Sequence, residues 1–295
     1  MRIVVTGASG QLARRTAELV LERVEPAQLI LVTRHVLELD DFAERGVTVR
    51  PGNFDDPALL ESSFAGGDRL LLISTDALGE RARQHAGAID AAVFAGVQKI
   101  VYTSIINPSD SNPAAVADEH RATEELVRGS ELAWTFLRNA IYADLLLGPA
   151  AVALAAGKLV TNEGDGRTSY VARDDCAAVA AAVLTSDSID HDYRAYDVTG
   201  PEALAPADLA AIYAELGGRP VEPVLVDDDA YVARLVEQAG VDEETARVYA
   251  TFGTAARRHY LAPVSTAVAD LTGQPPRSVR AVLEARRTEL AVAQP

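Results

Sequence analysis

A glycine turn near the start of the chain most constrains its fold, because it joins an apolar run at 2–6 to a helical pattern at 11–23. Gly7 permits a tight turn, and Gly10 lets the backbone approach a pyrophosphate, which the free N–H groups of the helix start would bind. Ala13 stands where a third glycine is often found, and its small side chain still allows close packing of helix on strand. The spacing predicts a dinucleotide-binding unit, whose cradle we assign to Gly7, Ser9, Gly10, Gln11 and Leu12.

Short apolar runs alternate with amphipathic helical patterns over the first 140 residues. One helix start is clearly marked, because Asp56 can cap it and Pro57 suits the first helical position. Such alternation predicts an α/β fold with a doubly wound parallel (Rossmann) sheet and right-handed crossovers. The predicted strands are 2–6, 28–33, 47–50, 69–74, 99–104 and 133–138, and the predicted helices are 11–23, 35–45, one from 56, 80–95 and 117–128.

The regular alternation ends after Asn139, where helical patterns dominate. The segment 174–200 fits the earlier pattern, so we expect it to return to the dinucleotide-binding domain formed by 1–142. The remainder, 143–173 and 201–295, is expected to form a smaller, interleaved C-terminal lobe on the substrate side. Within these parts we predict helices at 141–156, 174–184, 206–216, 228–239, 242–251 and 276–290, a loop at 157–166 and a strand at 195–198.

Arg34 ends the second predicted strand, where an acidic residue would accept hydrogen bonds from the ribose of NAD. An arginine there favours the 2′-phosphate of NADP, while a surface arginine that merely solvates the strand end is the open alternative. Ligands of doubly wound folds bind at the carboxyl ends of the strands, which adds four cofactor-binding candidates after the third and fourth strands: Asn53, Phe54, Ser74 and Thr75. The predicted cofactor is therefore NADP(H).

The charge of the chain narrows the partners that it can have. A formal net charge of −16 repels phosphate backbones and anionic lipid, so we expect no nucleic acid and no membrane as a partner. The first apolar run is too short for a signal-peptide core, and the apolar stretch 145–156 is too short to span a bilayer. We therefore expect a cytoplasmic protein that takes a small-molecule acceptor, with a homodimer as an open option.

Cysteine and histidine offer no metal-binding pattern. Cys176 is the single cysteine, which excludes an internal disulfide, and its alanine-rich surroundings predict a buried core residue. The five histidines are scattered along the chain, so we predict no metal site.

Several segments together carry a family resemblance. They are Val4–Leu12, Leu71–Ser74, Val101–Ser104, His120–Glu124, Leu137–Tyr142, 157–166 and Leu271–Gly273 with Val279. These segments resemble the NmrA-like branch of the atypical short-chain dehydrogenases/reductases, and within this branch the chain is most similar to the NADPH:quinone oxidoreductases and the triphenylmethane reductases. The resemblance implies a Rossmann domain, a small C-terminal lobe and a cleft between them, in which NADPH reduces a conjugated, fairly bulky acceptor.

The sequence lacks the tyrosine–lysine catalytic pair of typical short-chain dehydrogenases. Typical short-chain dehydrogenases use a tyrosine and a lysine four residues apart on a helix, but Lys99 and Lys158 are the only lysines and neither follows a tyrosine in this way. His120 falls where isoflavone reductases place their lysine, and could hydrogen-bond the ribose or carry a proton near neutral pH. We name four catalytic candidates, each with a plain packing or capping role as the alternative: Tyr142, His120, Asn139 and Ser104.

Hydride transfer to a quinone or a cationic dye needs little acid–base help, because the nicotinamide supplies the chemistry and the protein aligns the two rings. A simple ketone forms an alkoxide that must be protonated, so the missing pair is a handicap for such substrates. We therefore predict a reductase of quinone-like acceptors. A reductase of a carbonyl or imine and an NADP(H)-sensing regulator without catalysis, of which the same family has examples, are the alternatives.

Overall fold

The computed structural model describes residues 1–292 of the 295-residue chain. Its centre is a seven-stranded, wholly parallel sheet in the order β3-β2-β1-β4-β5-β6-β9, which confirms the doubly wound fold. From β1, the strands β2 and β3 follow on one side, and β4, β5, β6 and β9 follow on the other. The strand order therefore reverses between β1 and β4. The strands are β1 Ile3–Thr6, β2 Leu29–Thr33, β3 Thr48–Pro51, β4 Arg69–Leu72, β5 Lys99–Ile105, β6 Ala133–Asn139 and β9 Arg194–Val198.

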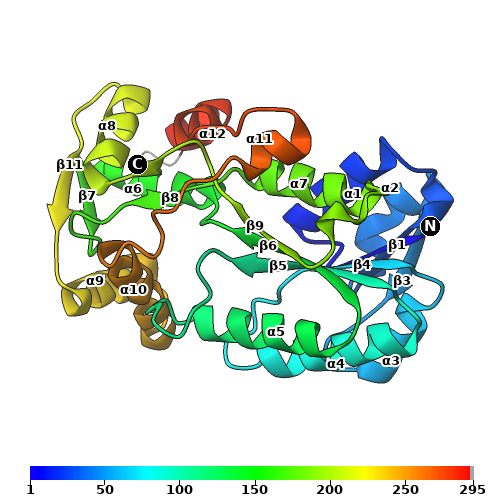
Figure 1. Ribbon diagram of the computed structural model, residues 1–295. Coiled ribbons are helices and arrows are strands. Elements are labelled where there is room, and N and C mark those ends of the chain that lie inside the picture. Colours follow the sequence, from blue (N-terminus) through cyan, green and yellow to red (C-terminus); the bar gives the residue numbers. More distant parts are fainter. Residues whose placement is uncertain (293–295) are drawn as a thin grey trace.

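Helices cover both faces of the sheet (Figure 1). On one face α1 packs against α7 and α7 against α11, and on the other face α3, α4 and α5 lie in sequence order. Each face has its own apolar core, since Val5 and Leu31 belong to one cluster and Val4 and Ile30 to the other. The helices are α1 Gln11–Leu21, α2 Asp40–Ala43, α3 Pro57–Phe64, α4 Arg81–Phe94, α5 Ala117–Gly129, α7 Arg173–Thr185 and α11 Ala267–Thr272.

The other elements gather at the opposite end of the molecule from β1 and β3 (Figure 1). They enclose a separate apolar cluster that includes Leu209, Tyr213 and Leu283 among its buried side chains. Two small sheets brace this part, one pairing β11 with β7 and one pairing β10 with β8. The elements are η3 Ala143–Leu146, α6 Leu147–Ala156, β7 Lys158–Thr161, β8 Thr168–Ser169, β10 Ala203–Leu204, α8 Pro206–Gly217, β11 Glu222–Leu225, α9 Asp228–Arg234, η5 Leu235–Ala239, α10 Glu243–Arg257, α12 Val279–Ala285 and α13 Arg287–Val292.

Three predictions for this second part were wrong in detail. The segment 157–166 is not all loop, because β7 forms there by pairing with β11, more than fifty residues later in the chain. The last predicted helix starts at Val279 rather than at Pro276, since the Ser278 hydroxyl caps it by accepting from the Ala281 N–H. It also breaks at Arg286, which separates α12 from α13.

The helix predicted at 242–251 continues to Arg257 through Gly253, a residue that usually weakens a helix. Here the glycine serves a close approach, because a Cβ atom on Gly253 would lie 2.0 Å from the side-chain oxygen of Asn162. Asn162 in turn donates to Asp228 and to the Ala250 carbonyl, at 2.7 and 2.8 Å. The segment after β7 therefore fastens α10 to the rest of the lobe.

No helix within residues 1–292 combines the length and the apolar character that crossing a membrane requires.

Candidate functional site

The turn after β1 has the geometry that its glycines predict. Gly7 has a φ of +60°, and the Gly10 N–H donates to the Gly7 carbonyl at 2.8 Å, so the chain folds back tightly before α1 begins. A Cβ atom on Gly10 would lie 3.1 Å from that carbonyl oxygen, and nothing but hydrogen fits there without displacement. Ser9 accepts a hydrogen bond from the Thr33 hydroxyl at 3.0 Å, which ties the turn to the end of β2.

A cavity of about 370 Å³ opens beside this turn, at the ends of β2 and β3. It is lined by Arg34, Asn53 and Phe54, as well as by Ser9. Two acidic residues line it, Asp55 and Asp76, and the carboxylate of Asp55 already accepts hydrogen bonds from Arg83 and Gln84 at 2.7 and 3.1 Å. Those hydrogen bonds, from Arg83 first, hold the pKa of Asp55 below its ordinary value.

A second cavity, of about 720 Å³, lies on the other side of the same turn. It is lined by the four catalytic candidates, Ser104, His120, Asn139 and Tyr142, and by Gln11 and Leu12 at the start of α1. Both cavities share Gly7, Gly10 and the segment 73–76, so they form one cleft across the carboxyl edge of the sheet. The structure thus brings together every site residue that the sequence predicts, while their roles stay predictions.

The segment 73–76 forms the floor of the cleft and is held by side chains from three other elements, β1, β5 and α4. Its backbone N–H groups donate to the Thr6 hydroxyl, the Thr103 hydroxyl and the His85 ring, at 3.0, 2.9 and 3.2 Å. Arg81 donates to the Thr75 carbonyl at 2.7 Å. This part of the cleft is therefore preorganised at the strand-order reversal, where open α/β sheets bind their ligands.

Two buried oxygens in the cleft have no partner among the described residues, the Asn139 Oδ1 and the Thr75 Oγ1. Both belong to residues that line the second cavity, and buried acceptors are normally hydrogen-bonded. A nicotinamide riboside offers carboxamide and hydroxyl donors of the kind that they lack. The glycine turn, the open helix start and these two oxygens together fit a dinucleotide, which would supply the hydride when bound.

Tyr142 stands beside Asn139 at the beginning of the second lobe. Its hydroxyl accepts a hydrogen bond from the Asn139 amide at 3.3 Å, which leaves the phenolic hydrogen free to donate. Burial raises the pKa of the Tyr142 phenol above its ordinary value, so it stays a neutral donor across the physiological range. These properties suit a group that donates to an oxygen on which negative charge develops.

His120 is 7% exposed, and its Nδ1 lies 2.7 Å from the Tyr102 hydroxyl. Burial, with the charge of Arg81 and with His85, lowers the pKa of His120 well below its ordinary value. A lowered pKa favours the neutral imidazole near pH 7, which argues against the expectation that His120 carries a proton there. The short separation fits donation from the phenol to Nδ1, which makes neutral His120 a hydrogen-bond donor through Nε2.

His85 continues the same buried network. Its Nε2 accepts from the Thr75 N–H, so Nδ1 carries the hydrogen and donates to Thr123 at 3.0 Å. Burial first and Arg81 second lower the pKa of His85 to about 3. His85 therefore fixes the cleft floor as a neutral group.

This low pKa predicts an acid-sensitive fold. The unfolded chain protonates a histidine below about pH 6.5 and the folded chain does not, so His85 makes stability fall as the pH drops from there towards 3. The free energy of unfolding of wild type should lose about 2 kcal/mol more between pH 7 and pH 5 than that of His85→Gln. Urea unfolding at both pH values measures this difference, and parallel pH dependences of the two proteins would contradict it.

Ser104 lines the cleft, but its hydroxyl hydrogen is used elsewhere. It donates to Glu124 at 2.8 Å, and Arg138 holds both oxygens of that buried carboxylate at 2.9 and 2.7 Å. This leaves Ser104 an acceptor towards the cleft. Lys99 starts β5 and pairs with Asp192 at 2.6 Å, about 16 Å along the strand from Ser104, so it stays away from the site.

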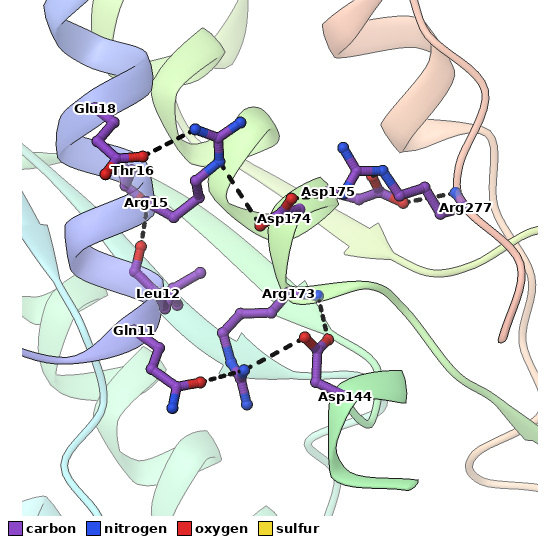
Figure 2. A network of polar contacts seen from close by, with 10 residues as sticks. All are labelled: Gln11, Leu12, Arg15, Thr16, Glu18, Asp144, Arg173, Asp174, Asp175 and Arg277. Carbon is purple, nitrogen blue, oxygen red and sulfur yellow. Dashed lines mark hydrogen bonds and ion pairs between the residues drawn. The ribbon is translucent and has the colours of Figure 1, made fainter. Parts of the chain in front are cut away.

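The sequence analysis missed Arg173, the first residue of α7, which lines the second cavity. Its guanidinium donates to the Gln11 side chain at 2.5 Å and lies 3.4 Å from Asp144 (Figure 2). The ring of Tyr142 lies 5.3 Å from the guanidinium carbon. Arg173 places a positive charge at the start of α7, where the helix dipole favours negative charge. This unfavourable placement was the one feature of the sequence that could have singled out Arg173.

The acceptor side of the cleft has an apolar mouth that was also missed. Leu78 follows β4, Leu145 lies in η3, and Val248, Tyr249 and Phe252 come from α10. Leu145 and Tyr249 are 58% and 48% exposed, so their apolar surface is open to a ligand. Three separate elements thus present apolar surface where a flat acceptor would lie over the cofactor.

Within residues 1–292 no cluster of three or more histidine, cysteine, aspartate or glutamate side chains could hold a metal ion.

Comparison with known proteins identifies the family. The family described as NAD(P)H-binding matches residues 7–187. Quinone oxidoreductase 2 of Escherichia coli is 33% identical over 273 residues, which are 92% of this chain and 94% of that protein. The NAD(P)H azoreductase of Xenophilus azovorans is 29% identical, over 94% of each chain.

Solved structures agree with this assignment. The NADPH complex of the Escherichia coli quinone oxidoreductase superposes with a TM-score of 0.91 at 31% identity, over 98% of this chain and 99% of that one. The Citrobacter sp. triphenylmethane reductase with NADP(H) gives 0.90 at 31% identity, over 96% and 99%. The resemblance read from the motifs is confirmed, and the chain belongs to the NAD(P)H-binding family, among its NmrA-like oxidoreductases.

Proposed function

We propose that the protein is an NADPH-dependent reductase that transfers hydride to a quinone-like or otherwise conjugated, bulky acceptor. One observation carries the proposal: the dinucleotide half of the cleft opens directly into a larger half with an apolar mouth. A nicotinamide above the floor at 73–76 would leave one face towards that mouth. Relatives named for quinone, azo-dye and triphenylmethane reduction support the same class of acceptor.

The division of labour follows the predicted domains. Residues 1–142, with 174–200, would bind the cofactor, and 143–173 with 201–295 would shape the acceptor side. Tyr142 is the proposed donor to the reduced acceptor, and His120 and Asn139 would hold the nicotinamide ribose and carboxamide. This assignment gives the unpartnered Asn139 Oδ1 a donor, the amide of the nicotinamide carboxamide.

A screen of NADPH oxidation tests the function. Purified protein is mixed with NADPH and, in separate reactions, with quinones, azo dyes, triphenylmethane dyes, enones and simple ketones. We expect turnover with at least one quinone or extended conjugated acceptor, and little with ketones. NADPH left unconsumed across the whole screen would overturn the proposal and favour the cofactor-sensing alternative.

Arg34 makes the cofactor preference testable. We expect NADPH to bind at least about tenfold more tightly than NADH, a difference of roughly 1.4 kcal/mol, because Arg34 lies exposed at the first cavity. Arg34→Ala should remove most of this difference. Arg14→Ala is the matched control, since Arg14 is a nearby surface arginine that pairs with Asp41. Titration of both cofactors measures the affinities, and equal affinities in wild type would contradict the assignment.

A further inference from the structure

Arg173 links the start of α1 at the phosphate turn to η3 on the acceptor side of the cleft. Its side chain is 16% exposed, and its backbone N–H donates to Asp144 at 2.9 Å while its guanidinium reaches Gln11 (Figure 2). Gln11 begins the helix at the phosphate turn, and Asp144 belongs to η3, next to Tyr142. The positive charge is thus held in place beside the proposed proton donor.

The other charged groups that line the second cavity do not compete with it. Arg81 is bound by the Thr75 carbonyl and by Glu119, at 2.7 and 3.2 Å, and Asp76 is exposed. His120 is neutral because burial lowers its pKa. Arg173 is therefore the cation of this cavity that lies beside Tyr142, and Asp144 offsets part of its charge.

This charge matters because acceptors differ in how hydride changes their own charge. A neutral quinone that gains a hydride becomes the hydroquinone monoanion, which one proton then converts to the hydroquinone. A cation near the anionic oxygen stabilises that product-like state. A cationic dye becomes neutral on gaining the same hydride, so a nearby cation repels the substrate and has no new charge to stabilise.

We propose that Arg173 selects acceptors by charge, favouring neutral and anionic conjugated acceptors over cationic ones. The inference rests on the proposed reductase function. It assigns the anionic oxygen of the reduced acceptor to the space between the Tyr142 hydroxyl and the Arg173 guanidinium.

The experiment compares kcat/KM for a neutral naphthoquinone, a sulfonated naphthoquinone and the cationic dye malachite green. In Arg173→Gln the kcat/KM for the sulfonated quinone divided by the kcat/KM for the cationic dye should fall at least about thirtyfold. Arg173→Lys should keep the order of preference among the three acceptors. Arg277→Gln is the matched control, because Arg277 pairs with Asp174 and Asp175 beside the same helix start but does not line the cavity (Figure 2). Its ratio should stay within about twofold of wild type.

A second variant moves the preference in the opposite direction. Asp144→Asn removes the counter-charge of Arg173 and should raise the ratio of the sulfonated quinone to the dye. If Arg173→Gln lowered kcat/KM equally for all three acceptors and also weakened NADPH binding, the inference would be overturned and Arg173 would be a phosphate ligand. Failure of wild type with every acceptor would instead reject the proposed function itself.

Discussion

Gly10→Val should abolish NADPH binding, with an affinity at least about a hundredfold below that of wild type. A valine side chain at this position points into the space that a pyrophosphate needs, and its Cβ already crowds the Gly7 carbonyl at 3.1 Å. The helix N–H groups would remain, but the phosphate could no longer reach them. Fluorescence titration with NADPH measures the loss.

The control for this variant is Gly129→Val, at the end of α5, where an added Cβ meets nothing within 4 Å. Both variants should keep the far-ultraviolet circular dichroism of wild type. Normal NADPH binding by folded Gly10→Val would place the cofactor elsewhere and reject the site described here.

Tyr142→Phe should lower kcat by about a hundredfold with quinone acceptors, because the lost hydroxyl no longer donates to the oxygen on which negative charge develops, while NADPH affinity stays unchanged. The substitution removes only the hydroxyl, so the ring still packs under Arg173 and the cleft keeps its shape. Because the pKa of Tyr142 is raised, the loss should be similar across neutral and mildly alkaline pH. Steady-state kinetics and cofactor titration together separate turnover from binding.

Tyr196→Phe is the corresponding control, since the Tyr196 hydroxyl bonds His191 and lies outside both cavities. An unchanged kcat in Tyr142→Phe would show that the proton comes from solvent or from another group. Loss of NADPH affinity in that variant would instead assign Tyr142 to the cofactor.

The first half of the fold follows from local sequence. The strand–turn–helix at Gly7 and Gly10, the cap at Asp56 and the apolar strands each depend on residues close together in the chain, so their pattern can be read directly. Most of the candidates in the cleft could be predicted as well, because they lie at the carboxyl ends of parallel strands or open the first helix. His120, inside α5, follows instead from the family resemblance.

The parts that were missed depend on distant partners. The strand β7 exists because β11 pairs with it, and α10 runs through Gly253 because Asn162 packs there. Arg173 is directed by Gln11 and Asp144, more than a hundred and nearly thirty residues away. The low pKa of His120 likewise comes from burial and from Arg81, which no local pattern reveals.

One side of helix α10 packs against the lobe, and the other side faces the mouth of the cleft. Ala246, Ala250 and Gly253 are buried and fasten it to the lobe, while Val248, Tyr249 and Phe252 face the mouth of the cleft. Phe252 also packs against the main apolar core, whereas Val248 and Tyr249 can be replaced without disturbing the contacts that hold the helix. Natural variation can therefore explore new acceptors at Val248 and Tyr249 at little cost in stability, and these two positions are the natural targets for a mutant library that seeks a reductase of altered scope.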